Sequence, residues 1–167
     1  TGRFRCDRNR EDFYLVAGRM VKYKNVDVIL EAFRGETRKL VVAGDAPEAK
    51  RLRKLACPHV QWSGPLSDKE LTDQLERCRA LVFAGEEDFG MVPVEAMAAG
   101  APLIALRRGG LTETVTAGET GVFFDQPTPE AVAAAVERFE REGVTAGPAE
   151  LQCTAQRFGV DRFEREI

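Results

Sequence analysis

Residues 80–106 read ALVFAGEEDFGMVPVEAMAAGAPLIAL. Two short apolar runs, Ala80–Ala84 and Pro102–Leu106, enclose a helix-like stretch that starts near Gly90 and ends at Gly100. Short runs that are apolar on both faces are typical of strands that helices cover on both sides. The glycine after the alanine-rich stretch is a common helix terminator. This segment therefore predicts a strand, a helix and a second strand parallel to the first.

The same alternation of apolar runs and amphipathic stretches continues over most of the chain. Further strands are predicted at Tyr14–Gly18, Leu40–Ala43, Val60–Trp62 and Val122–Phe124. Helices are predicted at Val26–Phe33 from apolar spacing, after Ser67 from a capping box with Glu70, and from Thr128-Pro129 to about Glu142. We therefore expect an α/β fold: a doubly wound, mainly parallel, Rossmann-like sheet of about six strands with helices on both faces.

The composition excludes several classes of protein. With 24 basic and 27 acidic residues among 167, the net charge of −3 is far from that of a nucleic-acid-binding protein. No apolar stretch approaches the ~20 residues that cross a bilayer. The cysteines, at positions 6, 57, 78 and 153, lack C-x-x-C spacing, and the single histidine completes no zinc set. We expect free, buried or half-buried thiols and no metal.

The two ends of the chain differ from its middle. Residues 1–12 interleave arginines with acidic residues, which predicts a solvated lead-in. A break rich in small residues, Gly143–Gly147, precedes a last helical segment at about Ala149–Ile167. Its apolar residues are expected either to dock on this domain or to reach toward a partner outside the chain; they are Phe158, Val160, Phe163 and Ile167.

The most polar loops follow the first and fourth predicted strands. In a doubly wound sheet of order 3-2-1-4-5-6, these strands are neighbours where the winding reverses, and ligands bind beyond their carboxyl ends. The first loop, Gly18–Asn25, carries the cations Arg19, Lys22 and Lys24, and the other, Gly85–Gly90, carries three carboxylates. The predicted ligand site lies between these two loops.

These residue types indicate recognition of an anion that also presents hydroxyl groups. Arg19 and Lys24 suit phosphate oxygens, and free N–H groups at a helix start near Gly90 donate to the same anion. Glu87 and Glu95, eight positions apart, suit the hydroxyls of a hexose and a ribose. Each feature also occurs without any ligand, as a surface cation, a solvated acidic loop or a dipole-favoured glutamate. The G-x-G-x-x-G, P-loop and G-x-S-x-G motifs are absent.

The run EDFGMVPVEAMAAGAP at residues 87–102 closely resembles the signature of group 1 retaining glycosyltransferases with the GT-B fold. That signature has two glutamates separated by seven residues, with Phe-Gly after the first and Glu-Ala-Met-Ala-x-Gly-x-Pro around the second. Gly18-Arg19 and Lys24 match the donor-phosphate residues of this family, and the resemblance extends over about residues 13–137. Two positions depart from it, because Asn25 and Ala46 stand where glycine is usual.

The resemblance implies that the chain is the C-terminal, donor-binding half of a GT-B enzyme. Residues 13–148 would bind the nucleotide sugar, with 1–12 as lead-in or interdomain linker and 149–167 as a C-terminal helical segment. It implies catalytic roles at the diphosphate for Arg19 and Lys24 and at the hexose for Glu87. The other implied donor-binding residues are Gly18, Phe89, Gly90, Met91 and Val92, with Leu66 and Asp68 at the base and Glu95 at the ribose. No metal or other cofactor is expected.

The pattern looks most like mannosyltransferases that use GDP-mannose in polysaccharide or glycolipid assembly. The expected reaction is transfer of mannose to a glycan or lipid-linked acceptor, which an N-terminal half outside this chain would bind, so that this fragment alone is inactive. The full-length protein is expected in the cytoplasm, or peripheral at the inner membrane face. A stand-alone nucleotide-sugar-binding or protein-interaction module, and a hydrolase or epimerase of sugar nucleotides, are the alternatives on the same fold.

Overall fold

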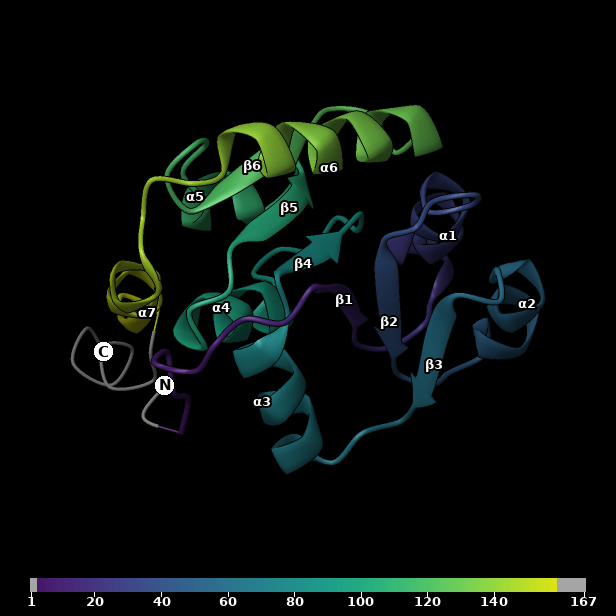
Figure 1. Cartoon of the computed structure of the whole chain (residues 1–167), viewed down its shortest axis with the longest axis horizontal. Coiled ribbons are helices and arrows are strands. Elements are labelled where there is room, and N and C mark those ends of the chain that lie inside the picture. Colours follow the sequence, from purple (N-terminus) through teal and green to yellow (C-terminus); the bar gives the residue numbers. More distant parts are fainter. Residues whose placement is uncertain (1–2, 159–167) are drawn as a thin grey trace.

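The computed structural model describes residues 3–158 and contains a six-stranded parallel sheet of order β3-β2-β1-β4-β5-β6 (Figure 1). Each neighbouring pair of strands is parallel. The strands are β1 (Phe13–Ala17), β2 (Lys39–Ala43), β3 (Val60–Gly64), β4 (Ala80–Phe83), β5 (Leu103–Leu106) and β6 (Gly121–Phe124). The predicted fold class and strand order are confirmed, with strand ends shifted by one or two residues.

Helices cover both faces of the sheet. They are α1 (Val26–Ala32), α2 (Ala49–Leu55), α3 (Asp68–Arg77), α4 (Met91–Ala98), α5 (Leu111–Thr114), α6 (Pro129–Glu142) and α7 (Pro148–Gln156), and a short 3₁₀ helix, η1, spans Lys22–Lys24. Figure 1 shows α3, α4 and α7 on one side of the sheet and α1, α2 and α6 on the other. Because side chains alternate along a strand, Leu15 of β1 packs in the core beneath α3, α4 and α7. Tyr14 and Val16 pack in the core beneath α1, α2 and α6. None of the helices in the described part is long and apolar enough to span a bilayer.

Two helix starts form as their sequences predict. The Ser67 hydroxyl accepts a hydrogen bond from the Glu70 amide, and the Glu70 carboxylate accepts one from the Ser67 amide at 2.8 Å. Thr128 caps α6 by accepting from the Ala131 amide at 3.2 Å, and Pro129 is the first helical residue. These bonds satisfy N–H groups that have no partner within the helix.

The N-terminal segment is less solvated than its charge pattern predicts. Phe4 is buried in the core beneath α3, α4 and α7. The Arg10 guanidinium donates to the carbonyls of Leu75 and Cys78 at the end of α3 and to that of Ala99 at the end of α4. The last carbonyls of a helix have no helical donor, so this one side chain ties two helix ends to the segment. The domain boundary at residue 12 stays a prediction.

The C-terminal helix is shorter than predicted. It begins at Pro148 and ends at Gln156, with Leu151 and Ala155 in the core against α4. Phe158 follows it, half-buried against the same core. The predicted apolar residues Val160, Phe163 and Ile167 lie outside the described residues.

The cysteine side chains agree with the expectation of free thiols, with one correction. All four are free; Cys78 is buried, Cys6 and Cys57 are half-buried, and Cys153 is exposed. Cys153 is exposed because it lies on α7 between Leu151 and Ala155, the two residues that this helix buries. Among residues 3–158, no group of three or more His, Cys, Asp or Glu side chains is arranged to hold a metal ion.

Substitution of Gly44 should destabilise the fold strongly. Its φ of +149° disfavours other residues, and a Cβ atom there would lie 1.9 Å from the Gly18 carbonyl oxygen. We expect Gly44→Ala to lower the free energy of unfolding by about 3 kcal/mol, since backbone strain and overpacking combine. Gly118 is the control, because its φ is +76° but no atom lies within 4 Å of the added Cβ. Gly118→Ala should cost about 1 kcal/mol in urea unfolding, and equal losses would contradict this explanation.

Candidate functional site

The two polar loops lie where the sheet reverses its winding. β1 pairs with β2 on one side and with β4 on the other, so the loops that follow β1 and β4 are adjacent at the carboxyl edge. This is the position at which open parallel sheets bind ligands. The two loops that the sequence predicts to form the site are therefore adjacent at this edge.

The loop after β1 is attached to both neighbouring strands. The Gly18 amide donates to the Ala43 carbonyl at 3.0 Å, and the Asn25 side-chain amide donates to the Ala84 carbonyl at 2.8 Å. Asn25 has a φ of +48°, in the left-handed region that asparagine tolerates better than most residues. Asparagine can therefore stand where the family usually has glycine, and its side chain adds a bond to the end of β4.

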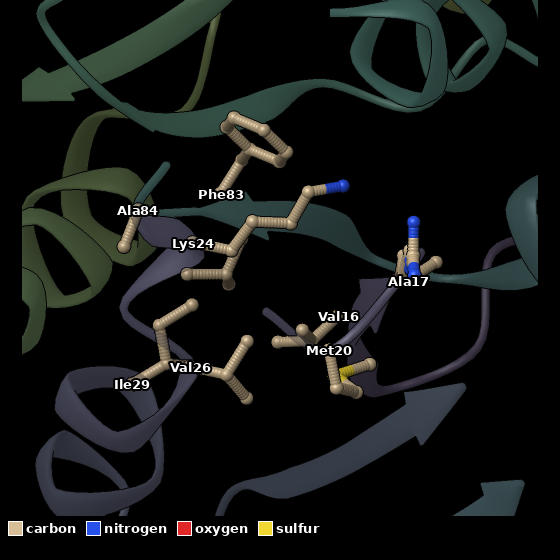
Figure 2. A pocket seen from close by; sticks show the side chains of 10 residues that line it. Val16, Ala17, Met20, Lys24, Val26, Ile29, Phe83 and Ala84 are labelled. Carbon is tan, nitrogen blue, oxygen red and sulfur yellow. The ribbon is translucent and has the colours of Figure 1, made fainter. Parts of the chain in front are cut away.

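Lys24 and Glu87 form an ion pair across the junction of the two loops. The Lys24 Nζ atom lies 3.0 Å from Glu87 Oε1, and the side chains are 11% and 23% exposed. Figure 2 shows the Lys24 side chain extending beside Phe83, whose ring centre is 5.8 Å from Nζ. A Cβ atom on Gly18 would lie 3.2 Å from the same Nζ, so the glycine leaves room for the ammonium group.

The backbone of Glu87 is held by a pair of glycines after β5. The Gly110 amide donates to the Glu87 carbonyl at 2.9 Å. A Cβ atom on Gly109 would lie 2.5 Å from that carbonyl oxygen, and one on Gly110 would lie 1.9 Å from the Asp88 carbonyl oxygen. The close packing of these two glycines therefore sets the position of the acidic loop.

A cavity of about 500 Å³ opens beside the ion pair. Its lining consists of Tyr23, Lys24, Glu86, Glu87, Asp88, Phe89, Gly90, Met91 and Val92. Gly90, with φ +68°, immediately precedes α4, and no side chain caps this helix. The unpaired N–H groups of the first turn and the Lys24 ammonium therefore offer positive charge at the same cavity, which suits an anion.

A second cavity, of about 300 Å³, lies on the other side of the Gly18 loop. It is lined by Gly18, Arg19, Ala43, Gly44, Asp45, Pro65, Leu66 and Leu71. Arg19 is exposed and has no ion pair among residues 3–158. Arg19 thus shares this cavity with Leu66, and Lys24 shares the larger one with Glu87, while Arg19 and Lys24 together line a third, smaller cavity.

Glu95 and Asp68 line neither cavity and meet a residue that sequence analysis did not single out. Arg3 Nη2 lies 2.6 Å from Glu95 Oε1, and Arg3 Nη1 lies 3.7 Å from Asp68 Oδ2. Burial raises the pKa of Glu95, and the Arg3 guanidinium opposes that shift. Arg3 was missed because its partners are far along the chain and its own segment reads as an ordinary charged stretch.

Comparisons with known proteins agree with this geometry. The model of the family "Glycosyl transferases group 1" matches residues 5–154. The chain belongs to the group 1 glycosyltransferases. The chain is 32% identical to a GDP-mannose-dependent alpha-mannosyltransferase of Mycobacterium tuberculosis over 135 residues, which are 77% of this chain and 35% of that protein. It is also 32% identical to an uncharacterised glycosyltransferase of Methanocaldococcus jannaschii over 123 residues, covering 71% and 35%.

Solved structures of glycosyltransferases share the fold of this chain. Anabaena HepE in complex with UDP and glucose superposes with a TM-score of 0.82 at 21% identity, covering 94% of this chain and 47% of that one. The structural neighbours are GT-B glycosyltransferases, so the Rossmann-like half of that fold is confirmed. This glycosyltransferase chain spans about a third of the length of the curated relatives it matches.

The Lys24–Glu87 pair should contribute measurably to stability, because both side chains are largely shielded from water. In a double-mutant cycle with Lys24→Gln and Glu87→Gln, we expect a coupling free energy of about 1–2 kcal/mol, between the values for exposed and buried pairs. Urea unfolding of the four proteins measures it. The exposed Arg141–Glu142 pair is the control, with an expected coupling below about 0.5 kcal/mol. Equal coupling in both cycles would argue against a special environment for Lys24.

Proposed function

We propose that this chain is the donor-binding half of a retaining glycosyltransferase that transfers mannose from GDP-mannose to a glycan or lipid-linked acceptor. The observation that carries the proposal is the shielded Lys24–Glu87 pair beside the uncapped start of α4. It puts an anion-binding group and a hydroxyl-binding group next to each other, as a sugar diphosphate requires. GDP-mannose is favoured because relatives named as GDP-mannose-dependent mannosyltransferases are 32% and 35% identical to this chain.

In the proposed complex, the diphosphate takes the place of Glu87 as the partner of Lys24. The Lys24 ammonium and the N–H groups at the start of α4 bind its oxygens, and the Glu87 carboxylate accepts hydrogen bonds from hexose hydroxyls. When the anomeric C–O bond breaks, negative charge develops on the departing diphosphate. Groups already directed at that charge lower the barrier, and one such group contributes roughly 3 kcal/mol.

The second cavity suits the nucleoside end of the donor. Leu66 offers an apolar surface to the base, and Asp68 begins α3 nearby. Arg19, exposed at the same cavity, is proposed to bind the diphosphate from the side opposite Lys24. Phe89, Met91 and Val92 are proposed to contact the sugar and phosphates through their backbone groups.

The acceptor is proposed to bind mainly to a second half of the protein. The curated relatives are about three times as long as the matched region, which favours an enzyme half over a stand-alone module. We therefore propose that the present chain binds donor but transfers nothing alone. Because cations and helix amides suffice to stabilise the leaving group, no metal or other cofactor is part of the proposal, and the reaction is proposed to occur in the cytoplasm or at the inner membrane face.

Removal of either proposed phosphate-binding cation should weaken nucleotide binding. We expect Lys24→Ala and Arg19→Ala each to reduce the affinity for GDP by about 1.5–3 kcal/mol, the size of a charge-assisted hydrogen bond. Isothermal titration calorimetry measures the change. Lys50→Ala, on the exposed face of α2, is the control and should bind as the wild type does. Unchanged affinity in both site variants would contradict the assignment of the diphosphate to this loop.

A donor screen separates the mannosyl proposal from its alternatives. We expect the full-length protein, given an acceptor, to consume GDP-mannose faster than UDP-glucose. Preference for a UDP-sugar would refute the choice of donor but keep the proposed site. Fast turnover of GDP-mannose without any acceptor would instead support a sugar-nucleotide hydrolase or epimerase.

A further inference from the structure

The N-terminal segment delivers one cation to two carboxylates that the family resemblance assigns to the nucleoside end of the donor. Arg3 Nη2 lies 2.6 Å from Glu95 Oε1, at the second glutamate of the family signature, and Arg3 Nη1 lies 3.7 Å from Asp68 Oδ2. Ninety-two positions separate Arg3 from Glu95. Figure 1 shows the N-terminal segment running beside α4 and α7, and Glu95 lies on α4.

The residues that follow Arg3 hold it in place. The Phe4 side chain is buried in the core, and its ring centre lies 4.8 Å from the Arg3 guanidinium carbon. The Phe4 carbonyl accepts a hydrogen bond from Gln152 of α7 at 2.9 Å. The Arg5 amide donates to Glu76 of α3 at 2.7 Å. The backbone next to Arg3 is thus anchored to two helices, so the guanidinium extends from a fixed segment of backbone.

Without Arg3, Glu95 would face an unfavourable charge environment. Burial raises the pKa of Glu95, the Asp68 carboxylate raises it further, and Arg3 lowers it. Helix α4 contains no other ionisable side chain, and the charged groups that face Glu95 within the described part of the chain come from the N-terminal segment and from α3. Arg3 is therefore the side chain that opposes this rise in the pKa of Glu95 and offsets the repulsion between Glu95 and Asp68.

The contact with Arg3 leaves Glu95 available to a ligand. Arg3 bonds to Oε1, and Oε2 has no hydrogen-bond partner among residues 3–158. A guanidinium that blocked the carboxylate would cover both oxygens in a bidentate pair, which this geometry does not have. An ionised carboxylate with one oxygen fixed and the other free is suited to accept hydrogen bonds from a pair of sugar hydroxyls.

We propose that Arg3 is a positioning residue for the nucleoside end of the donor, holding the Glu95 carboxylate in the orientation that receives the ribose hydroxyls. This inference rests on the proposed function and on the contact between Glu95 and the ribose that the family resemblance implies. It adds the N-terminal segment to the donor site, in which Arg3 itself touches Glu95 rather than the reacting atoms.

The test is GDP binding by wild type and three variants, Arg3→Gln, Arg3→Lys and Arg5→Gln, at pH 8 and pH 5.5, by isothermal titration calorimetry. Arg3→Gln should bind about fivefold more weakly at pH 8 and about 20-fold more weakly at pH 5.5. The loss grows because, without the cation, Glu95 is protonated at a higher pH and accepts hydrogen bonds less well. Arg3→Lys should recover most of the affinity at both pH values, since it restores the charge.

The matched control is Arg5→Gln, because Arg5 lies on the same segment but its exposed side chain pairs with Asp7. It should bind GDP as the wild type does, and all variants should keep a wild-type melting temperature within about 3 °C. If the wild type binds GDP and Arg3→Gln binds equally at both pH values, or more tightly, the inference is overturned while the proposed function stands. If the wild type binds neither GDP nor UDP, the proposed function fails and this inference with it.

Discussion

Direct contact between backbones at the carboxyl edge of the sheet is the constraint on which the site depends. Gly44 meets the Gly18 carbonyl, and Gly109 and Gly110 meet the carbonyls of Glu87 and Asp88, at distances that no Cβ atom would allow. Four loops are therefore drawn together in two pairs, those after β1 and β2 and those after β4 and β5. Lys24, from the loop after β1, reaches Glu87, from the loop after β4, across 3.0 Å.

Both glutamates of the signature are paired with a cation, whereas Arg19 has no ion pair in the described part of the chain. Lys24 is paired with Glu87, and Arg3 with Glu95. The side chains of the first pair are the ones proposed to bind the two chemical groups of the substrate, its anion and its hydroxyls. Ligand binding would therefore give each half-buried side chain a new partner instead of leaving its charge without one. The second pair has the same form, because Arg3 contacts Oε1 of Glu95 and Lys24 contacts Oε1 of Glu87. Each glutamate of the signature thus meets its cation through one carboxylate oxygen.

Local sequence pattern was sufficient for most of the fold and for the adjacency of the two polar loops at the carboxyl edge. Runs apolar on both faces marked the strands, and Ser67 with Glu70 marked the start of α3, because these signals depend on neighbours in sequence. The sequence did not reveal that Arg10 binds carbonyls more than sixty positions away, or that Arg3 binds Glu95. Their segment has the composition of a solvated stretch, and its partners exist only after α3 and α4 have packed. The roles of the predicted site residues toward a ligand stay predictions.

Helix α4 is surrounded by protein along most of its length. Its residues from Ala96 to Ala98 are fully buried, and α7 packs against it, with Gln152 bonded to the Ala98 carbonyl at 2.8 Å. A helix enclosed in this way cannot shift alone without opening voids in a close-packed interior. Movement of this helix would therefore require its neighbours to move with it, whereas the exposed side chains near its start, among them Phe89 and Met91, can adjust alone.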